Sequence, residues 1–528
     1  MASRRDELNA YTFARKRMVG AFLQPSGGGN DEDAPRPVRA VLPSFVVAAV
    51  TVAGFGMWGV IKPAAPVNWD SGKYIVQAKQ STTRYVVLKD PTNGQMVLHQ
   101  VLNMSSARLV LPAGAEVMPV ADDVLDKYRN HGATIGIPYA PDRLPKAADA
   151  GAAKKWSVCD RPGNATNTQE SISQSVFVAA DKEAETLAAK DKMLADGQAL
   201  FVQGPPTGGT PGSKYLVDST GTRHAVGPVD TQAGDQQAME SALFGRGTQP
   251  QQVTDDWLRT LADGKAITFP KIPGFVDGKV TLSTVDVSST AEKRVGRVLQ
   301  FQDSFFVVGT DHIYAVTPLQ AELILNDPGM DTVYDRKKPE PFQLTPSDNA
   351  KLAPLVDTEA MKAPVTWPSN RIDKAVNAGT DKGARSVVCS TFESIEKNVV
   401  KRSVWAWTDY PAPVSSGSLS AHVTPGHGLL YRAVDNVGAE TSGSDFLITE
   451  TGLRYSLPNN NDGPAGAAGA SATPAPGGQP EQKSEANEAQ ARLGYKDIVP
   501  TQVPVEWSKL VPGGGVLNTF AALQAQNA

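Results

Sequence analysis

Few residues of this 528-residue chain stand at spacings typical of a catalytic or ligand-binding motif. The segment GGTPGSK at 208–214 lacks the Gly-Lys-Ser/Thr order of a loop that binds nucleotide phosphates through backbone N–H groups. The segment GTDKGARS at 379–386 fails in the same way, because Lys382 precedes the glycine. Neither a GxSxG nucleophile turn nor an HExxH helix occurs. We therefore assign no catalytic and no cofactor-binding residues.

Histidine and tryptophan side chains are the remaining candidates for a metal or sugar site. The six histidines are scattered, and only His422 and His427 lie near each other, on either side of a Pro-Gly turn. A surface turn beside a strand explains this pair better than a metal site. Packing in the protein core is favoured over a sugar-stacking platform for five tryptophans, namely Trp156, Trp257, Trp405, Trp407 and Trp507. We expect no metal ligands and no cofactor.

An uncharged run of 22 residues, 40–61, is the feature that decides where the protein works. As a helix it would be ~33 Å long, enough to cross a ~30 Å hydrocarbon core. The alternative is a cleaved signal peptide, but the apolar run exceeds the length of a signal h-region. We therefore predict one transmembrane helix that acts as a signal-anchor.

Flanking charge predicts the orientation of this helix. Seven cations precede it, whereas only Lys62 and Lys73 follow closely. The positive-inside tendency places the N-terminus in the cytoplasm and residues 62–528 outside the cytoplasmic (inner) membrane. The seven cations are Arg4, Arg5, Arg15, Lys16, Arg17, Arg36 and Arg39.

The first 39 residues contain a basic segment with large apolar side chains. It predicts an amphipathic helix that docks on a partner or on the anionic inner leaflet. A solvated helix that only supplies charge for orientation is the alternative. The residues expected to dock are Tyr11, Phe13, Arg15, Lys16, Arg17 and Phe22.

Composition and cysteine content agree with a large domain outside the cytoplasm. A hydrophobic content of 41% is sufficient for two or more domain-sized cores, and a net charge of −4 gives no indication of nucleic-acid binding. The chain has two cysteines, Cys159 and Cys389. In an oxidising compartment they predict one disulfide, with two buried free thiols as the alternative.

A β-hairpin pattern recurs four times along the outer region. KYLVDSTGTRHAV at 214–226 matches DFLITETGLRYSL at 445–457 at a constant offset, and shorter or longer turns occur in copies at 305–316 and 84–102. Alternating apolar residues around a Gly-containing turn are typical of a hairpin. The expected hairpin turns contain Asn93, Gly94, Thr220, Gly221, Thr451 and Gly452, and the first expected core aromatics are Tyr85, Tyr215, Phe306 and Phe446.

A short helix follows the hairpin in each copy. QQVTDDWLRTLADG at 251–264 matches TQVPVEWSKLVPGG at 501–514, so Trp257 and Trp507 are predicted core residues. Thr254 is the expected N-cap, and Gly264 is expected to end the turn. The fourth copy carries an Ala/Gly/Pro-rich insert at 459–489, which we predict to be disordered.

Cys159 and Cys389 occupy similar places between successive hairpins, which predicts a duplication with a pseudo-twofold axis. The expected fold class is α+β, with a single transmembrane helix and an elongated extracytoplasmic domain of four hairpin-containing repeats around a central disulfide-bridged core. The predicted domains are a cytoplasmic segment at 1–39, the transmembrane helix at 40–61 and the extracytoplasmic domain at 62–528. Within that domain we expect repeat 1 at about 73–145, a first core segment at about 146–205, repeat 2 at about 206–275, repeat 3 at about 295–365, a second core segment at about 366–435, repeat 4 at about 440–515 and a tail at 516–528.

These features together resemble EccB, a core membrane component of the type VII (ESX) secretion system of actinobacteria. The resemblance rests on YTFARKRMVGAFLQP before the anchor, WSVC at 156–159, SVVC at 386–389, TPGHGLLYRAV at 424–434 and FLITETGLRYSLP at 446–458. It implies a scaffold subunit that links the cytoplasmic motor side to an extracytoplasmic assembly. The implied partners are an EccC-type FtsK-like ATPase, EccD, EccE, the mycosin protease, the lipid bilayer and further copies of the chain.

The competing hypothesis is a membrane-anchored extracytoplasmic hydrolase, either a nucleotide hydrolase or a cell-wall enzyme. ATPase activity has been attributed to the EccB family. This sequence has no phosphate-binding loop that would support it. The scaffold is therefore the favoured interpretation.

Overall fold

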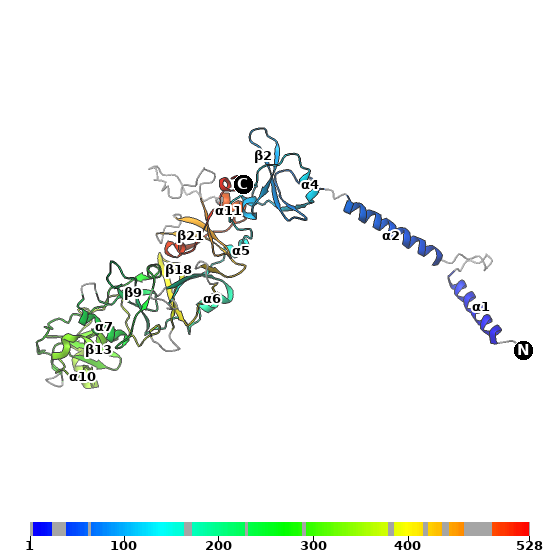
Figure 1. Ribbon diagram of the computed structural model, residues 1–528. Coiled ribbons are helices and arrows are strands. Elements are labelled where there is room, and N and C mark those ends of the chain that lie inside the picture. The colour runs from blue at the N-terminus through cyan, green and yellow to red at the C-terminus, as the bar shows by residue number, and fades with distance from the viewer. Residues whose placement is uncertain are drawn as a thin grey trace. The chain divides into compact units, whose positions relative to one another are not determined.

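The computed structural model describes residues 4–23, 38–61, 65–162, 172–227, 231–287, 292–378, 385–414, 421–435, 443–458 and 488–526. The chain divides into an N-terminal part, Met1–Val67, and a C-terminal part, Asn68–Ala528 (Figure 1). Most of the insert predicted to be disordered, up to residue 487, lies outside the described residues. Its last two residues, Glu488 and Ala489, begin a helix, so the prediction was wrong for that end.

The N-terminal part consists of two helices, α1 (Arg4–Leu23) and α2 (Val38–Ile61). In α1, Tyr11, Phe13 and Phe22 are all exposed to solvent. The second helix spans the uncharged run and contains Pro43. Across the described stretches of the chain, no helix combines the length and apolarity required of a membrane span.

Among the described residues of the C-terminal part, four of the five sheets share one plan, which defines repeats 1 to 4. Three consecutive strands pair antiparallel. A helix then carries the chain back to a short segment parallel to the first strand, and a second short helix leads to a segment parallel to the third strand. Parallel pairing requires such crossovers, because a tight turn can join antiparallel strands only.

The elements follow the same order in every repeat. Repeat 1 comprises β1 (Ile75–Ala78), β2 (Arg84–Lys89), β3 (Met96–Val101), α3 (Met104–Val110), β4 (Val117–Val120) and α4 (Asp122–Asp126). Repeat 2 comprises β7 (Gln198–Gln203), β8 (Lys214–Val217), β9 (Thr222–Ala225), α7 (Ala233–Phe244), β10 (Gln251–Gln252), α8 (Asp255–Arg259) and β11 (Ala262–Asp263). Repeat 3 comprises β12 (Val298–Phe301), β13 (Ser304–Val308), β14 (Ile313–Val316), α9 (Pro318–Asn326), η1 (Pro328–Thr332), β15 (Phe342–Gln343), α10 (Pro346–Leu352), η2 (Ala353–Leu355) and β16 (Val356–Asp357). Repeat 4 comprises β21 (Leu429–Val434), β22 (Ser444–Ile448), β23 (Arg454–Leu457), α11 (Glu488–Leu493), β24 (Thr501–Pro504), α12 (Val505–Lys509), β25 (Gly513–Val516) and α13 (Thr519–Ala522).

The hairpins recognised in the sequence are the second and third strands of each repeat. The first strands β7 and β21 begin at 198 and 429, ahead of the expected repeat limits of 206 and 440. The connection after the first strand varies in length, from Gln302–Asp303 in repeat 3 to residues 204–213 in repeat 2. A constant sequence offset therefore cannot reveal these strands.

The fifth sheet is the core sheet, with strand order β19-β18-β5-β6-β20. Two antiparallel hairpins, β5–β6 and β18–β19, meet through their first strands, and Cys159 on β5 lies directly opposite Cys389 on β18. The two cysteines form a disulfide, which confirms the predicted bridge. The core elements are α5 (Ala147–Ala150), β5 (Lys155–Arg161), β6 (Ser173–Ala179), α6 (Asp181–Leu187), β18 (Val387–Glu396), β19 (Val399–Trp407) and β20 (Ala421–Val423). Strand β17 (Lys374–Ala375) precedes β18 in the chain but pairs in parallel with β7 of repeat 2.

The two faces of the core sheet bury different sets of side chains. Trp156 and Val388 belong to a large apolar cluster that continues into repeats 2 and 4. The disulfide lies on the other face, in a smaller cluster with Leu187 of α6. Repeat 1 shares a cluster with repeat 4, and repeat 2 shares one with repeat 3.

Candidate functional site at the junctions of repeats and core sheet

The predicted repeat tryptophans pack between the repeats and the core sheet. Trp257 on α8 and Trp507 on α12 are fully buried in the cluster that covers one face of this sheet. Thr254 is the N-cap of α8, since its side chain accepts a hydrogen bond from the backbone N–H of Trp257 at 3.1 Å. Three residues after the N-caps of α4 and α10, repeats 1 and 3 have Val124 and Asp348 instead. Only the even-numbered repeats thus carry the tryptophan.

The hairpin turns of repeats 2 and 4 contact opposite edges of the core sheet. Gly221 and Gly452 are buried and have φ values of +74° and +75°. A Cβ atom on Gly221 would lie 2.9 Å from the Cβ of Arg402 on β19, and one on Gly452 would lie 2.3 Å from the carbonyl oxygen of Ala421 on β20. Glycine is therefore required at both turns for backbone conformation and for close approach.

The remaining turn residues of the prediction lie at the surface. Asn93, Thr220 and Thr451 are exposed. Gly94 also has a positive φ, +71°, but a Cβ there would meet only the end of a lysine side chain at 3.6 Å. The turn of repeat 1 therefore makes no close contact comparable to those of repeats 2 and 4.

The four predicted hairpin aromatics occupy the same position of their repeats and are all half-buried. Tyr215 and Phe446 pack against the apolar cluster of the core sheet, whereas Phe306 packs within repeat 3. Tyr85 is half-buried on β2 of repeat 1. The structure thus brings together the predicted residues of repeats 2 and 4, and it leaves those of repeats 1 and 3 away from the core sheet.

In three repeats, a ring side chain of the third strand packs directly against a glycine of the neighbouring segment. Built Cβ atoms on Gly132, Gly264 and Gly514 would clash with the rings of His99, His224 and Tyr455 at 2.2, 2.3 and 2.4 Å, respectively. The Nδ1 atoms of the two histidines lie 2.8 and 3.0 Å from the carbonyl oxygens of Ala133 and Lys265. These contacts indicate packing positions.

The expectation that Gly264 ends the helical turn was wrong. Helix α8 ends at Arg259, with Thr260 as the C-cap. Gly264 follows β11 and leaves room for the imidazole of His224. The sequence pattern identified a required glycine but assigned it the wrong role.

Asp160 is a buried carboxyl group that the sequence did not identify. Its oxygens accept hydrogen bonds from the backbone N–H of Thr254 at 2.7 Å and from the Gln174 side chain at 3.1 Å. Burial raises the pKa of Asp160 to about 6, although these hydrogen bonds oppose the rise. The group ties β5 of the core sheet to the helix α8 of repeat 2.

Tyr431 is a second residue that sequence reasoning missed. Its hydroxyl lies 3.0 Å from Ser508 Oγ, and its ring meets Trp156 edge-on at 5.1 Å between centroids. Burial raises the pKa of this phenol to about 12. The signal was the largely apolar run of residues 429–434, which forms the first strand of repeat 4.

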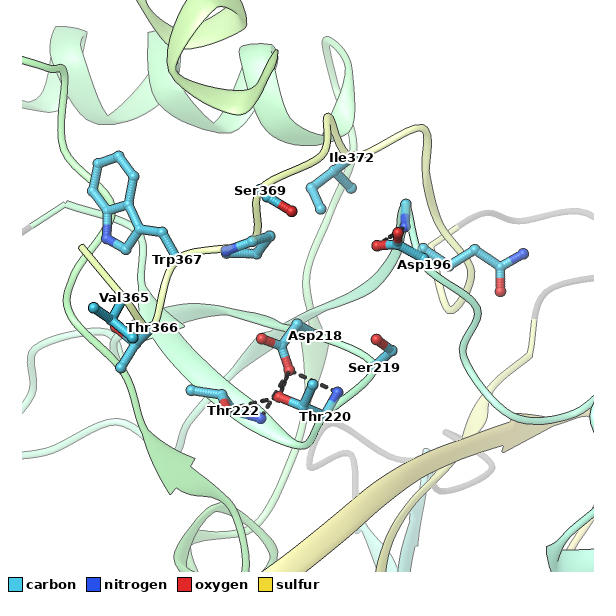
Figure 2. A pocket seen from close by; sticks show the side chains of 13 residues that line it. Asp196, Asp218, Ser219, Thr220, Thr222, Val365, Thr366, Trp367, Ser369 and Ile372 are labelled. Carbon is cyan, nitrogen blue, oxygen red and sulfur yellow. Dashed lines mark hydrogen bonds between the residues drawn. The ribbon is translucent and has the colours of Figure 1, made fainter. Parts of the chain in front are cut away.

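A pocket of about 310 Å³ lies beside the turn of repeat 2 (Figure 2). Figure 2 shows Asp218, Thr220 and Thr222 grouped on one wall, opposite Trp367 and Ser369. Asp218 Oδ1 accepts hydrogen bonds from both backbone N–H groups of the two threonines and from the Thr220 hydroxyl. These bonds, together with His224, hold the pKa of Asp218 below its usual range although burial alone would raise it. The carboxylate therefore stabilises its own turn.

His422 and His427, which are close in sequence, contact separate carboxylates. His422 Nε2 lies 3.0 Å from Glu183, and His427 Nδ1 lies 2.6 Å from Asp149. Within the described residues, no group of three or more His, Cys, Asp and Glu side chains is arranged to hold a metal ion.

The geometry defines a class of protein: an α+β body in which four repeats of one plan surround a disulfide-bridged sheet. Over residues 1–528 the chain matches the family described as type VII secretion system ESX-1, transport TM domain B, which is the EccB family. The chain belongs to this family, and the resemblance inferred from its motifs is confirmed.

Individual relatives are distant in sequence but cover most of the chain. The ESX-3 secretion system ATPase EccB3 of Mycobacterium tuberculosis (strain ATCC 25618 / H37Rv) is 26% identical over 90% of this chain and 81% of its own length. The EccB3 protein of Mycolicibacterium smegmatis (strain ATCC 700084 / mc(2)155) is 23% identical over 83% of this chain and 79% of its own length.

Solved structures share the fold at low sequence identity. A chain of the intact ESX-5 inner membrane complex matches with a TM-score of 0.55 and 19% identity, covering all of this chain and 96% of its own. A chain of the EccB3 dimer from the ESX-3 core complex also has a TM-score of 0.55 and 19% identity, with 86% and 100% coverage. The mixed α+β fold is therefore that of EccB structures.

Proposed function

We propose that this chain is a structural scaffold subunit of a type VII (ESX) secretion membrane complex. The observation that carries the proposal is the family match over residues 1–528, because it includes both helices of the N-terminal part as well as all four repeats. Related chains have been solved within the ESX-5 inner membrane complex and as a dimer from the ESX-3 core complex.

The proposal includes one membrane crossing by residues 40–61. Support comes from the 22-residue uncharged run and from the excess of cations before it. The disulfide adds independent support, since such bonds persist in oxidising compartments. The N-terminus then lies in the cytoplasm and the C-terminal part lies outside the cytoplasmic membrane.

We further propose a division of the outer region that follows its sheets. Repeats 2 and 4 clamp the core sheet through Trp257 and Trp507, and through Gly221 and Gly452 at its edges. Repeat 1 packs against repeat 4, and repeat 3 packs against repeat 2. Repeats 1 and 3 therefore offer surfaces for assembly. The sheet boundaries favour starting repeat 2 at 198 and repeat 4 at 429.

The proposed partners are an EccC-type FtsK-like ATPase, EccD, EccE, the mycosin protease and further copies of this chain. Helix α1 is proposed as the cytoplasmic docking element, because its large apolar side chains Tyr11, Phe13 and Phe22 are exposed beside a run of three cations. Exposed apolar groups of this size favour a protein or lipid partner over water.

Affinity purification from detergent-solubilised membranes tests the scaffold. We expect recovery of the FtsK-like ATPase with the wild-type chain and loss of that ATPase when Tyr11, Phe13 and Phe22 are changed to Ser. A Val399→Ser variant, altered at an exposed valine of the C-terminal part, serves as the control and should retain the ATPase. Recovery of the wild-type chain only as a monomer without an ATPase would refute the scaffold proposal.

Single introduced cysteines test the membrane crossing independently. The sequence has only two cysteines and both are in the disulfide, so an added thiol is labelled without background. On spheroplasts, a membrane-impermeant maleimide should label Lys338→Cys at once, because Lys338 is exposed, and should label Asn9→Cys only after permeabilisation. Labelling of both positions in intact spheroplasts would contradict the orientation.

A further inference from the structure

One end of the disulfide-bearing face of the core sheet carries three cations that lie over aromatic rings. The guanidinium carbon of Arg161 is 5.7 Å from the centre of the Tyr410 ring. Two cations lie over the ring of Trp407, the Lys192 ammonium nitrogen at 5.2 Å and the Arg385 guanidinium carbon at 5.5 Å. Such distances are typical of cation–π contacts. We call these five residues the cation–aromatic cluster.

The register of the core sheet places the cluster on this face. Arg161 is the last residue of β5 and follows Cys159 by two positions, so both side chains point to the same face. Trp407, the last residue of β19, and Tyr410 both pack against the apolar cluster around the disulfide. The hydroxyl of Tyr410 donates a hydrogen bond to the carbonyl oxygen of Ser173 on β6 at 2.7 Å. The aromatic rings are therefore fixed to the sheet.

The other two cations come from segments that are themselves attached to neighbouring backbone. The carbonyl oxygen of Lys192 accepts a hydrogen bond from the backbone N–H of Ala406 on β19 at 2.9 Å. Arg385 lies two residues before β18, and its backbone N–H donates to the carbonyl oxygen of Val376 at 3.2 Å. Three segments remote in sequence thus bring their cations together.

All three cations of the cluster are half-buried and have no ion pair within the residues that the structure describes. Nη1 of Arg385 is buried and has no hydrogen-bond partner there. Arginines of similar exposure elsewhere in the C-terminal part behave differently, since Arg297 pairs with Glu292 and Arg432 pairs with Asp445. Partial burial removes water from a cation, and an aromatic face offsets only part of that loss. An added anion would therefore be stabilised at the cluster.

The carboxylates that are adjacent in sequence do not neutralise the cluster. Asp160 precedes Arg161 but points to the opposite face, where it accepts the backbone N–H of Thr254. Asp191 and Asp409 are both exposed, and neither pairs with a cation in the described part of the chain. The anion must therefore come from another molecule.

The spacing of the cations favours an extended acidic segment over a single small anion. Arg161 and Trp407 end two strands that are separated by β18, so their backbones lie ~10 Å apart at ~4.8 Å per strand. In an extended peptide, carboxylates two to four residues apart are separated by ~7–13 Å. Arginine, tryptophan and tyrosine are also the residue types most enriched at the centres of protein–protein interfaces.

We propose that the cation–aromatic cluster is a docking site for an extended acidic segment of an extracytoplasmic protein partner. Carboxylates of that segment pair with Arg161 at one end and with Lys192 and Arg385 at the other. The inference deepens the proposed scaffold function, on which the extracytoplasmic location of the partner rests.

Peptide binding to the purified full-length protein in uncharged detergent tests the site. The probe is a fluorescein-labelled peptide of four Glu-Ser repeats, and the neutral control has four Gln-Ser repeats. Fluorescence anisotropy at low salt should show at least about tenfold tighter binding of the glutamate peptide, because several charge pairs act together. Equal affinity for the two peptides, or no binding of either, would overturn the proposal.

The variant Arg161→Gln/Lys192→Gln/Arg385→Gln removes the three charges and should weaken binding of the glutamate peptide at least about tenfold. Arg385→Gln alone should weaken it about two- to fivefold, and it serves as the test if the triple variant does not fold. Retention of full affinity by the single variant would refute the role of the orphaned guanidinium.

A charge-matched control separates the cluster from general attraction to positive charge. It removes the same charge at exposed lysines of repeats 1 and 3 and should retain the affinity of the wild type. The control substitutions are Lys127→Gln, Lys338→Gln and Lys362→Gln. Equal weakening in the control and in the triple variant would refute a specific site.

Competition identifies the chemistry of the ligand. Inorganic phosphate should displace the glutamate peptide no better than chloride at equal ionic strength, because one small anion cannot span the separated cations. Stronger displacement by phosphate would assign the cluster to phosphate groups and overturn the proposed peptide site. Failure of peptide binding would leave recovery of the FtsK-like ATPase unaffected, so it can be distinguished from failure of the scaffold proposal.

Discussion

Asp160 shows how one side chain distinguishes the two halves of the core. It follows Cys159, and its carboxyl group accepts the backbone N–H of Thr254. Ser390 follows Cys389 in the other half, and Pro504 stands at the position of Thr254 in repeat 4. Proline has no N–H, so the second half has no donor at this position and no need of a carboxylate. The two cysteine strands therefore differ at the residue after the cysteine, where only β5 faces a backbone donor.

The raised pKa of Asp160 makes a prediction about stability and pH. Since its folded-state pKa is about 6 and its ordinary value is 3.8, the folded protein binds a proton between these pH values that the unfolded chain does not. The contribution of Asp160 to stability is therefore greatest at about pH 4 and is lost as the pH rises through 6. The difference is up to about 3 kcal/mol.

Asp160→Asn isolates this contribution, because the amide oxygen can still accept the Thr254 N–H but does not ionise. We expect the variant to be more stable than the wild type at pH 7 and to lose this advantage towards pH 4.5. Denaturant midpoints at four pH values measure the difference. A variant that is less stable than the wild type at pH 7 would contradict the prediction.

Residues that belong to a repeated motif could be predicted from the sequence. Residues that join two segments remote in sequence could not. Trp257 and Trp507 share one motif, so their burial follows from the pattern. Asp160 has no counterpart, and its partner lies 94 residues further along the chain, so only the register of β5 reveals its role. Gly264 was recognised as a required glycine, but the ring that requires it comes from another strand.

The hairpin turns of repeats 2 and 4 are the elements that hold the core sheet by its edges. Gly452→Ala introduces a Cβ at 2.3 Å from a backbone oxygen on β20, which cannot move without disturbing the sheet. We expect a loss of about 2–4 kcal/mol of unfolding free energy, from overpacking and the positive φ together. Thermal unfolding of the disulfide-intact protein measures the change.

Gly94→Ala is the matched control for this substitution. Its φ is nearly the same, but the space around it is open, so only the conformational cost of about 1 kcal/mol applies. Equal losses in the two variants would show that the contact with β20 contributes nothing.

The hairpins could be predicted from the sequence because similar apolar residues recur in the second and third strands of the repeats, on either side of a turn that contains glycine. The first strands could not, since the connections after them differ in length between repeats. The core sheet was foreseen only as a pair of equivalent cysteine segments. Its strand order depends on pairing between β5 and β18, which are more than 200 residues apart, and no local pattern encodes such a pairing.

For the whole C-terminal part, the disulfide is the covalent bond between the two hairpins of the core sheet. It joins residues 230 positions apart, and loop-closure entropy predicts a stabilisation of about 5 kcal/mol. We expect the Cys159→Ala/Cys389→Ala double variant to unfold at a clearly lower guanidinium concentration. Reductant should lower the midpoint of the wild type towards that of the variant and leave the variant unchanged.

The C-terminal residues close the chain onto its first repeat. Gly136 donates a backbone hydrogen bond to Gln524 at 3.2 Å, and Gln526 donates one to Thr134 at 2.8 Å. The Gln526 side chain adds a third bond, to the carbonyl of Gly136 at 2.7 Å. These residues extend the repeat 1 sheet beyond the segment that pairs with β3. Repeat 1 is thereby held by a strand-like segment that comes from the far end of the sequence.

Removal of residues 524–528 should therefore loosen repeat 1 selectively. Three hydrogen bonds are lost, and each contributes about 1 kcal/mol. The loss of two of them is already enough for the exchange of amides at 131–137 to rise at least about tenfold. The strands of repeat 3 should keep their protection, because no hydrogen bond described for them involves the removed residues. Removal of residues 527–528 alone is the matched control and should leave exchange unchanged. Equal exchange of repeat 1 in both truncations would show that the hydrogen bonds of Gln524 and Gln526 do not stabilise repeat 1. The contacts of α3 with α11 and α13 would then be sufficient to hold repeat 1 in place.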